Sequence, residues 1–199
     1  MRWAATLSLI LLPFAAQAQE VFGFATIDGR DVVLYTDNSW EYAARDDDAE
    51  CEIIARNVDF CGGQVGWERT LEPNADIAAT YRYDDRHYGQ MIVEELGTKD
   101  GLTEDVMMQI VLDNAVAVIG GTPADVRTLE TFWSRVANQR IQTIVYAFNI
   151  DGLDVVYANG IRTAPNRTMQ LMTFSIGTEF TDRHRNLHED FLSEIRITK

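Results

Sequence analysis

The sequence has few basic residues: its 199 residues include 17 Lys and Arg against 31 Asp and Glu, for a net charge of −14. Nucleic acids and anionic lipid surfaces are bound through clustered Lys and Arg, so this composition argues against both as partners. A solvated acidic face accounts for such a charge in most proteins. The same charge would also suit a basic protein partner or cations.

The sequence also lacks the short motifs of common catalytic and nucleotide-binding sites. It contains no G-x-S-x-G, no G-x-G-x-x-G and no Walker loop, so neither an activated serine nor a phosphate-binding loop is indicated. Apolar residues make up 46% of the chain, which is typical of a folded globular protein. We therefore expect a folded protein that is not an enzyme and that needs no cofactor.

No hydrophobic run is long enough to span a bilayer. The first eighteen residues instead have the features of a secretory signal peptide: Arg2, the short apolar run Ala4–Phe14 and the cleavage pattern Ala16-Gln17-Ala18. No cysteine follows the run, so a lipid anchor is not expected. Cleavage before Gln19 would release a still more acidic chain, which we expect to be periplasmic or secreted, without a membrane anchor.

Cysteine is equally scarce, because Cys51 and Cys61 are the only two. In an oxidising compartment two such cysteines most simply pair with each other. The alternative is a redox or metal pair, but redox pairs usually have C-x-x-C spacing and a zinc site needs more ligands nearby. The sequence therefore predicts a structural disulfide between Cys51 and Cys61.

Changes in pattern along the chain divide it into four parts. Residues 1–18 form the signal peptide, and 19–44 are expected to form a small antiparallel β unit around Asp28-Gly29, a segment that resembles part of many bacterial exported proteins. Residues 45–66 begin with the acidic run Arg45–Glu50 and contain both cysteines, and we interpret them as a linker. Residues 67–199 are predicted to form the main α+β domain.

The main domain is organised around a predicted hairpin, in which Ile141–Ile150 and Leu153–Arg162 are joined by Asp151-Gly152. Asp-Gly between two β-branched apolar runs is a strong hairpin signal, because both turn residues must take positive φ. Thr122-Pro123 could begin a helix, but the β-branched and aromatic residues that follow favour a strand.

The other predicted elements place one helix inside the series of strands and one after it. Strands are predicted at Ile77–Tyr83, Tyr88–Leu96, Val126–Val136 and Thr168–Ile176. Helices are predicted from Thr103 to Ile119 and from Thr181 onward, the second with a buried stripe of Leu187, Phe191 and Ile195. The fold class is therefore α+β, with an antiparallel sheet flanked by helices.

Several short segments mark this element order: Tyr88-Gly89 through Val93-Glu94, Leu96-Gly97, Thr103-Glu104, Tyr146-Ala147-Phe148 and Phe191-Leu192. With them, residues 67–199 resemble the PsbP-like α/β/α sandwich. That fold is named for a photosystem accessory subunit and is widespread in exported bacterial proteins. The resemblance implies an accessory or ligand-binding domain without catalysis, although a fold alone does not decide function.

Two histidines form the best candidate metal site. His184 and His188 are four residues apart on the last predicted helix, so they share a face. With Glu189 or Asp190 they could hold Zn²⁺ or Cu²⁺, for which imidazole and carboxylate ligands are suitable. The alternative is a hydrogen-bonded histidine at the edge of the core, because Leu187 lies beside them.

Two further clusters contain polar or aromatic residues. Asp84, Asp85 and His87 lie together in a predicted turn, where a carboxylate beside an imidazole can do acid–base work, but a polar turn is the better explanation. Tyr81, Tyr83 and Tyr88 would form a binding surface if the fold leaves them bare, although aromatic residues on strands are more often core.

The sequence thus predicts an exported, non-catalytic binding or accessory protein whose partner is a small ligand or a basic protein. The first alternative is a metal-dependent hydrolase that uses His184 and His188. The second is a structural factor in envelope assembly, with the apolar helix Val106–Ile119 as its partner-facing surface.

Overall fold

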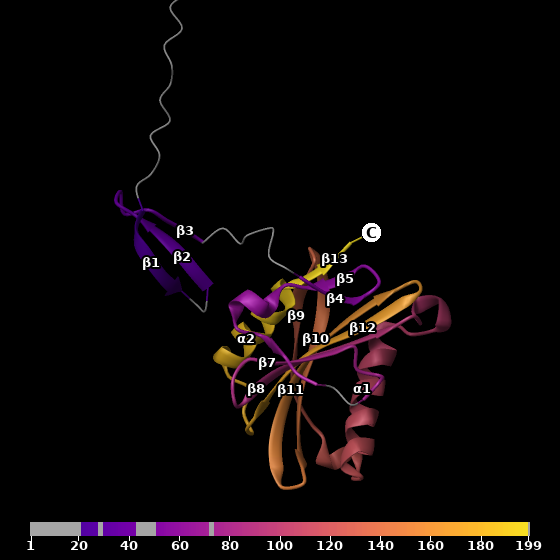
Figure 1. Cartoon of the computed structure of the whole chain (residues 1–199). Coiled ribbons are helices and arrows are strands. Elements are labelled where there is room, and N and C mark those ends of the chain that lie inside the picture. The colour runs from indigo at the N-terminus through magenta and orange to yellow at the C-terminus, as the bar shows by residue number, and fades with distance from the viewer. Residues whose placement is uncertain (1–20, 28–29, 43–50, 72–73, 199) are drawn as a thin grey trace, which may run out of the picture. The chain divides into compact units, whose positions relative to one another are not determined.

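The computed structural model describes residues 21–27, 30–42, 51–71 and 74–198. These residues fall into two compact units, the first within 1–44 and the second within 45–199. Figure 1 shows the elements of both. The expected signal peptide at 1–18 and the acidic run at 45–50 lie outside the described residues.

The first unit is the small antiparallel sheet that the sequence predicts. Its strand order is β1 (Val21–Ile27), β2 (Arg30–Tyr35) and β3 (Trp40–Tyr42). Val32 on the central strand is fully buried, whereas Phe22 and Trp40 are exposed. Asn38 takes a φ of 63° in the turn between β2 and β3, as asparagine tolerates.

The second unit is built on a seven-stranded sheet with the order β6-β7-β8-β12-β11-β10-β9. Each pair of neighbouring strands in this sheet is antiparallel. The predicted antiparallel run of strands is therefore confirmed. Its strands are β6 (Glu68–Arg69), β7 (Ala79–Arg82), β8 (His87–Glu94), β9 (Arg127–Val136), β10 (Gln139–Ile150), β11 (Leu153–Ala164) and β12 (Arg167–Ile176).

The central hairpin forms as the Asp-Gly signal predicts. Ile150 pairs with Leu153, and Asp151 and Gly152 take φ values of 52° and 86°. The alternative helix at Thr122-Pro123 is only the three-residue 3₁₀ turn η3 (Pro123–Asp125), after which β9 begins. The strand prediction for this segment is therefore confirmed.

The helix α1 (Glu104–Ile119) covers one face of the sheet. Thr103 caps its first turn, and Gly120 ends it with a φ of 61°. Its buried residues pack on the even-numbered side chains of β10, which point to one face because side chains alternate along a strand. That core contains Met107, Val111, Ala115, Ile144, Tyr146 and Phe148.

The helix α2 (Asp182–Ser193) packs on the opposite face, against odd-numbered side chains such as Ile141. The prediction is wrong at its C-terminal end, because the chain leaves the helix after Ser193. Ile195 is buried as expected, but it lies in the short strand β13 (Ile195–Ile197) and pairs with Phe60. The spacing of four between buried apolar residues therefore extends beyond the end of the helix, although Ile195 is buried for a different reason.

The segment 51–66 is not a linker. It contains β4 (Glu52–Ala55), β5 (Val58–Phe60) and the 3₁₀ turn η1 (Gly62–Val65), and β5 pairs with both β4 and β13. Val58 is fully buried, and the Phe60 ring lies 5.0 Å from the Phe191 ring between centroids. The predicted disulfide joins Cys51 to Cys61 across this small sheet.

Candidate functional site

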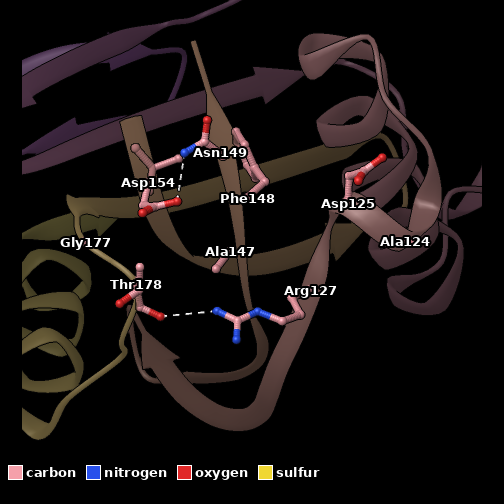
Figure 2. A pocket seen from close by; sticks show the side chains of 10 residues that line it. Ala124, Asp125, Arg127, Ala147, Phe148, Asn149, Asp154, Gly177 and Thr178 are labelled. Carbon is pink, nitrogen blue, oxygen red and sulfur yellow. Dashed lines mark hydrogen bonds between the residues drawn. The ribbon is translucent and has the colours of Figure 1, made fainter. Parts of the chain in front are cut away.

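A pocket of about 280 Å³ lies where β9 begins and where β10 and β11 approach their turn, as Figure 2 shows. Four elements meet there: η3, the start of β9, the β10–β11 hairpin and the loop that follows β12. Its lining is formed by Ala124, Asp125, Arg127, Ala147, Phe148, Asn149, Asp154, Val155, Gly177 and Thr178.

The pocket has an apolar floor at Ala147 and a polar rim. Ala147, Phe148 and Val155 are all buried, but Phe148 and Val155 belong to the core under α1, whereas Ala147 belongs to the core on the other face of the sheet. Ala147 therefore lies on the same face as Arg127 and Asp154, and the side chains of Phe148 and Val155 do not. Ala147 pairs with Arg127 on one neighbouring strand and with Val156 on the other. Because alanine is small, the space above this part of the sheet stays open.

The hairpin turn fixes the polar groups on one side of the pocket. The Asn149 side chain donates from Nδ2 to Asp154 Oδ1 at 2.8 Å and accepts from the Gly152 N–H at 2.9 Å. The carbonyl of Asp154 accepts from the Gly177 N–H at 2.8 Å, which ties the loop after β12 to the hairpin. Asp154 is thereby held at the rim while its side chain stays exposed.

The other side of the rim carries Arg127 and Asp125, and these two residues differ in how many of their hydrogen-bonding groups are already used. Asp125 caps η3: its carboxylate accepts from the N–H and the hydroxyl of Thr122, both at 2.8 Å. These bonds lower the pKa of Asp125 below its ordinary value. Arg127 donates one bond of 3.4 Å to the Thr178 carbonyl, which leaves most of its donors available (Figure 2).

The two predicted metal ligands lie in different surroundings. His188 is fully buried, and its Nδ1 and Nε2 lie 3.0 Å and 3.4 Å from the hydroxyls of Thr173 and Thr143. Burial, with a smaller effect of Arg185, lowers the pKa of His188 to about 3, so its imidazole is neutral at pH 7. His188 is thus hydrogen-bonded, as in the alternative that the sequence offers, but it lies inside the core and not at its edge.

His184 is half-buried near the start of α2, and its Nδ1 accepts from the Thr181 N–H at 3.0 Å. Burial and the neighbouring His87 and Arg183 lower the pKa of His184. Among the described residues, no group of three or more His, Cys, Asp or Glu is arranged to hold a metal ion. Metal binding by His184 and His188 stays a prediction.

Asp84 and His87 are joined by hydrogen bonds within the turn between β7 and β8. Asp84 Oδ1 accepts from the N–H groups of Arg86 and His87 at 2.8 and 3.0 Å and lies 2.7 Å from His87 Nδ1. Burial acts to raise the pKa of Asp84, but these bonds outweigh it and lower the pKa. The His87 ring lies 5.4 Å from the His184 ring between centroids, whereas the Asp85 side chain is exposed. The cluster therefore fixes the turn and joins it to α2.

The three tyrosines do not form one exposed surface, which corrects the prediction. Tyr81 is 2% exposed and donates to Glu52 at 2.7 Å, and burial together with this bond raises its pKa. Tyr83 packs on Trp67 with ring centroids 5.1 Å apart. Tyr88 follows the opposite alternation and stacks on Phe174, so it lies on the other face of the sheet.

The comparisons with known proteins concern the fold alone. No family model matches the sequence, and no curated protein matches it. The solution structure of a cyanobacterial PsbP (CyanoP) from Synechocystis sp. PCC 6803 is similar at 12% identity and a TM-score of 0.45, over 94% of this chain and 99% of that one. A PsbP is thus among the similar solved structures, as the resemblance in the sequence predicts.

A crystal structure of a protein from Bacteroides thetaiotaomicron VPI-5482 is similar at 9% identity and a TM-score of 0.42. The similarity covers 68% of this chain and 43% of that protein, so this chain spans less than half of its length. Neither likeness identifies a ligand or an activity. Separately, within the described residues no helix is both long and apolar enough to cross a membrane.

Proposed function

We propose that this protein is an exported, non-catalytic binding protein that holds a small ligand in the pocket between η3, the β10–β11 hairpin and the loop after β12. The observation that carries the proposal is the construction of that pocket. A buried apolar floor at Ala147 is combined with a few polar groups held in place by hydrogen bonds, which is how small-molecule sites are commonly built.

The lining chemistry favours binding over catalysis. The ten lining residues include no histidine, cysteine, serine, lysine or tyrosine, which most often act as bases or nucleophiles. Of the two carboxylates, Asp125 is engaged in capping η3. The remaining groups can orient a ligand but form no nucleophile–base pair.

Export is supported by the disulfide between Cys51 and Cys61, because such bonds persist in oxidising compartments. The predicted signal peptide points the same way. In the periplasm or outside the cell, a small binding protein meets ligands directly from its surroundings. A role as a binding or accessory protein follows from these two features together with the pocket.

The proposal is tested by filling the pocket. Ala147→Phe places a ring in the open space, and Ala117→Phe makes the same change at an exposed position of α1 as the control. Thermal unfolding of both variants and the wild type is measured with a panel of amino acids, betaines, dicarboxylates, amines and sugars at millimolar concentration. A ligand at about 100 times its Kd stabilises the folded state by about 2.7 kcal/mol.

We expect at least one compound to raise the Tm of the wild type and of Ala117→Phe by several degrees without raising that of Ala147→Phe. A panel without any stabilising compound would contradict the proposal. So would a compound that stabilises all three proteins equally, since its site would then lie elsewhere.

A further inference from the structure

We infer that the pocket binds a zwitterionic small molecule, with the anionic group of the ligand at Arg127 and its cationic group at Asp154. This inference rests on the proposed binding function and names the ligand class. An amino acid or a betaine has the required chemistry.

The strand register places the two charges on opposite sides of the same open space. Arg127 on β9 pairs with Ala147 on β10, and Asp154 on β11 pairs with Asn149, two residues further along β10. Two strand spacings and two residues separate their Cα atoms by roughly 12 Å. Figure 2 shows the two side chains on either side of Ala147, so a small molecule lying over Ala147 has one charged residue on each side.

Neither charge is neutralised by the other. In the part of the chain that the structure describes, no ion pair joins Arg127 to Asp154, although both are exposed and line the same pocket. Arg127 uses one of its five N–H donors on the Thr178 carbonyl, in a long bond. Asp154 accepts one bond from the Asn149 amide, which leaves its carboxylate with further acceptor capacity.

The surrounding charges select against ligands that carry one charge. A simple anion at Arg127 would also face Asp154, Asp125 and the field of a protein with a net charge of −14. A simple cation at Asp154 would face the guanidinium of Arg127 across the pocket. A zwitterion places an opposite charge at each side chain, so that the two close attractions outweigh the longer-range repulsions across the pocket.

The size and wall of the pocket limit the rest of the molecule. A volume of about 280 Å³ lies just below the usual range of about 300–1,000 Å³ for ligand pockets, so the ligand is small. The buried side chain of Ala147, on the same sheet face as the two charged residues, suits a short apolar segment between the charged groups of the ligand. Sugars, dicarboxylates and polyamines lack one or more of these features.

The inference is tested by calorimetric titration of the full chain with matched probes. Glycine betaine and a series of ω-amino acids from glycine to 6-aminohexanoate carry both charges at increasing separation. Hexanoate and hexylamine each carry one of the two charges on a chain of similar length. The proteins are the wild type, Arg127→Gln, Asp154→Asn and the control Arg135→Gln, which removes an exposed arginine from the same strand outside the pocket.

We expect one or more zwitterions to bind the wild type and Arg135→Gln at least about 10-fold more tightly than either single-charge probe, since a charge-assisted hydrogen bond contributes roughly this factor. Arg127→Gln and Asp154→Asn should each weaken zwitterion binding by a similar factor. Arg127→Gln should also strengthen binding of hexylamine, because it removes the repulsion of the amine.

Two results would overturn the inference. In the first, hexanoate or hexylamine binds the wild type as tightly as every zwitterion. In the second, zwitterion binding is unchanged in Arg127→Gln or in Asp154→Asn. If the pocket-filling experiment still identifies a neutral or singly charged ligand, the binding function is supported and only the zwitterion assignment fails. If no compound in that panel stabilises the protein either, both the binding function and the zwitterion assignment fail.

Discussion

His188 on α2 and Thr173 on β12 meet inside the core, with His188 Nδ1 3.0 Å from the Thr173 hydroxyl. On the other side of the ring, Nε2 lies 3.4 Å from the Thr143 hydroxyl, which is 2.8 Å from the hydroxyl of Ser134. A chain of buried polar groups therefore joins the helix to three strands. Each group is satisfied by a neighbour, as buried polar groups require.

The buried imidazole predicts a loss of stability at mildly acidic pH. The pKa of His188 is about 3 in the folded protein, against 6.5 as its ordinary value, because burial disfavours the charged ring. Above pH 6.5 the ring is neutral in both states, and its contribution to stability is fully present. As the pH falls from 6.5 towards 3, the unfolded chain binds a proton that the folded chain does not. The free energy of unfolding then falls by up to about 1.4 kcal/mol per pH unit.

The measurement is urea denaturation of the wild type and His188→Gln between pH 7.5 and pH 5, where carboxylates titrate least. The variant should be less stable at pH 7.5 by about 1–3 kcal/mol, since its amide fits the two threonine hydroxyls poorly. Its stability should depend less on pH than that of the wild type. Parallel pH profiles for the two proteins would show that His188 does not titrate on unfolding.

Local patterns in the sequence were sufficient to predict most of the fold. The Asp151-Gly152 turn needs two residues with positive φ, and this requirement belongs to the dipeptide itself. Thr103 and Gly120 likewise mark the ends of α1 through their own capping chemistry. Such signals act over a few residues and can be recognised without tertiary structure.

The errors concern residues whose roles depend on distant partners. Ile195 looked helical because it continues a spacing of four, but it pairs with Phe60, far away in the sequence. Tyr81 and Tyr88 are both aromatic residues on predicted strands, so the sequence groups them together. In the structure Tyr81 contacts Phe60, whereas Tyr88 stacks on Phe174 on the opposite face of the sheet. No local pattern distinguishes these cases.

The candidate pocket was missed for the same reason. Arg127 and Asp154 are more than twenty residues apart, and only the register of β9, β10 and β11 brings them to one opening. Considered alone, each is a charged residue near the end of a strand, which by itself does not indicate a binding site. His184 and His188 suggest a metal site because they are four residues apart in the sequence, yet His188 is buried in the core.

Reduction of the disulfide should destabilise the second unit. The bond between Cys51 and Cys61 spans a sequence separation of 10 residues, and closing so short a loop stabilises by about 2–3 kcal/mol on the chain-entropy model. Urea denaturation with and without a reducing agent measures the difference. The variant Cys51→Ala/Cys61→Ala should match the reduced wild type and should not respond to the reductant. Equal stability of the oxidised and reduced wild type would contradict this account.

Gly89 on β8 should tolerate no side chain, because the Phe191 ring lies against its Cα. A Cβ at this position would approach the ring to 2.5 Å, and Phe191 is fully buried. We expect Gly89→Ala to lower the free energy of unfolding by about 1–3 kcal/mol, the usual cost of overpacking a core. Gly63→Ala is the matched control, since no atom lies within 4 Å of its Cβ. Similar stabilities of the two variants, measured by urea denaturation, would show that Phe191 moves aside without cost.

The role of residues 51–66 as core rather than linker can be tested at Phe60. Its side chain is 2% exposed, and its ring lies 4.3 Å from the Tyr81 ring and 5.0 Å from the Phe191 ring between centroids. Phe60→Ala should therefore destabilise the protein by about 3–5 kcal/mol, the usual range for a buried aromatic residue.

Ile53→Ala on the paired strand β4 provides the control, because its side chain is 78% exposed and its loss should change stability by less than about 0.5 kcal/mol. Both variants keep the two cysteines, so the disulfide is the same in each. If β4 and β5 were only a disulfide-bonded appendage, Phe60→Ala and Ile53→Ala would unfold at the same urea concentration as the wild type. A large effect of Phe60→Ala alone would place the folding boundary of the second unit before β5, because β5 would then contribute to the same cooperative transition as α2 and β7.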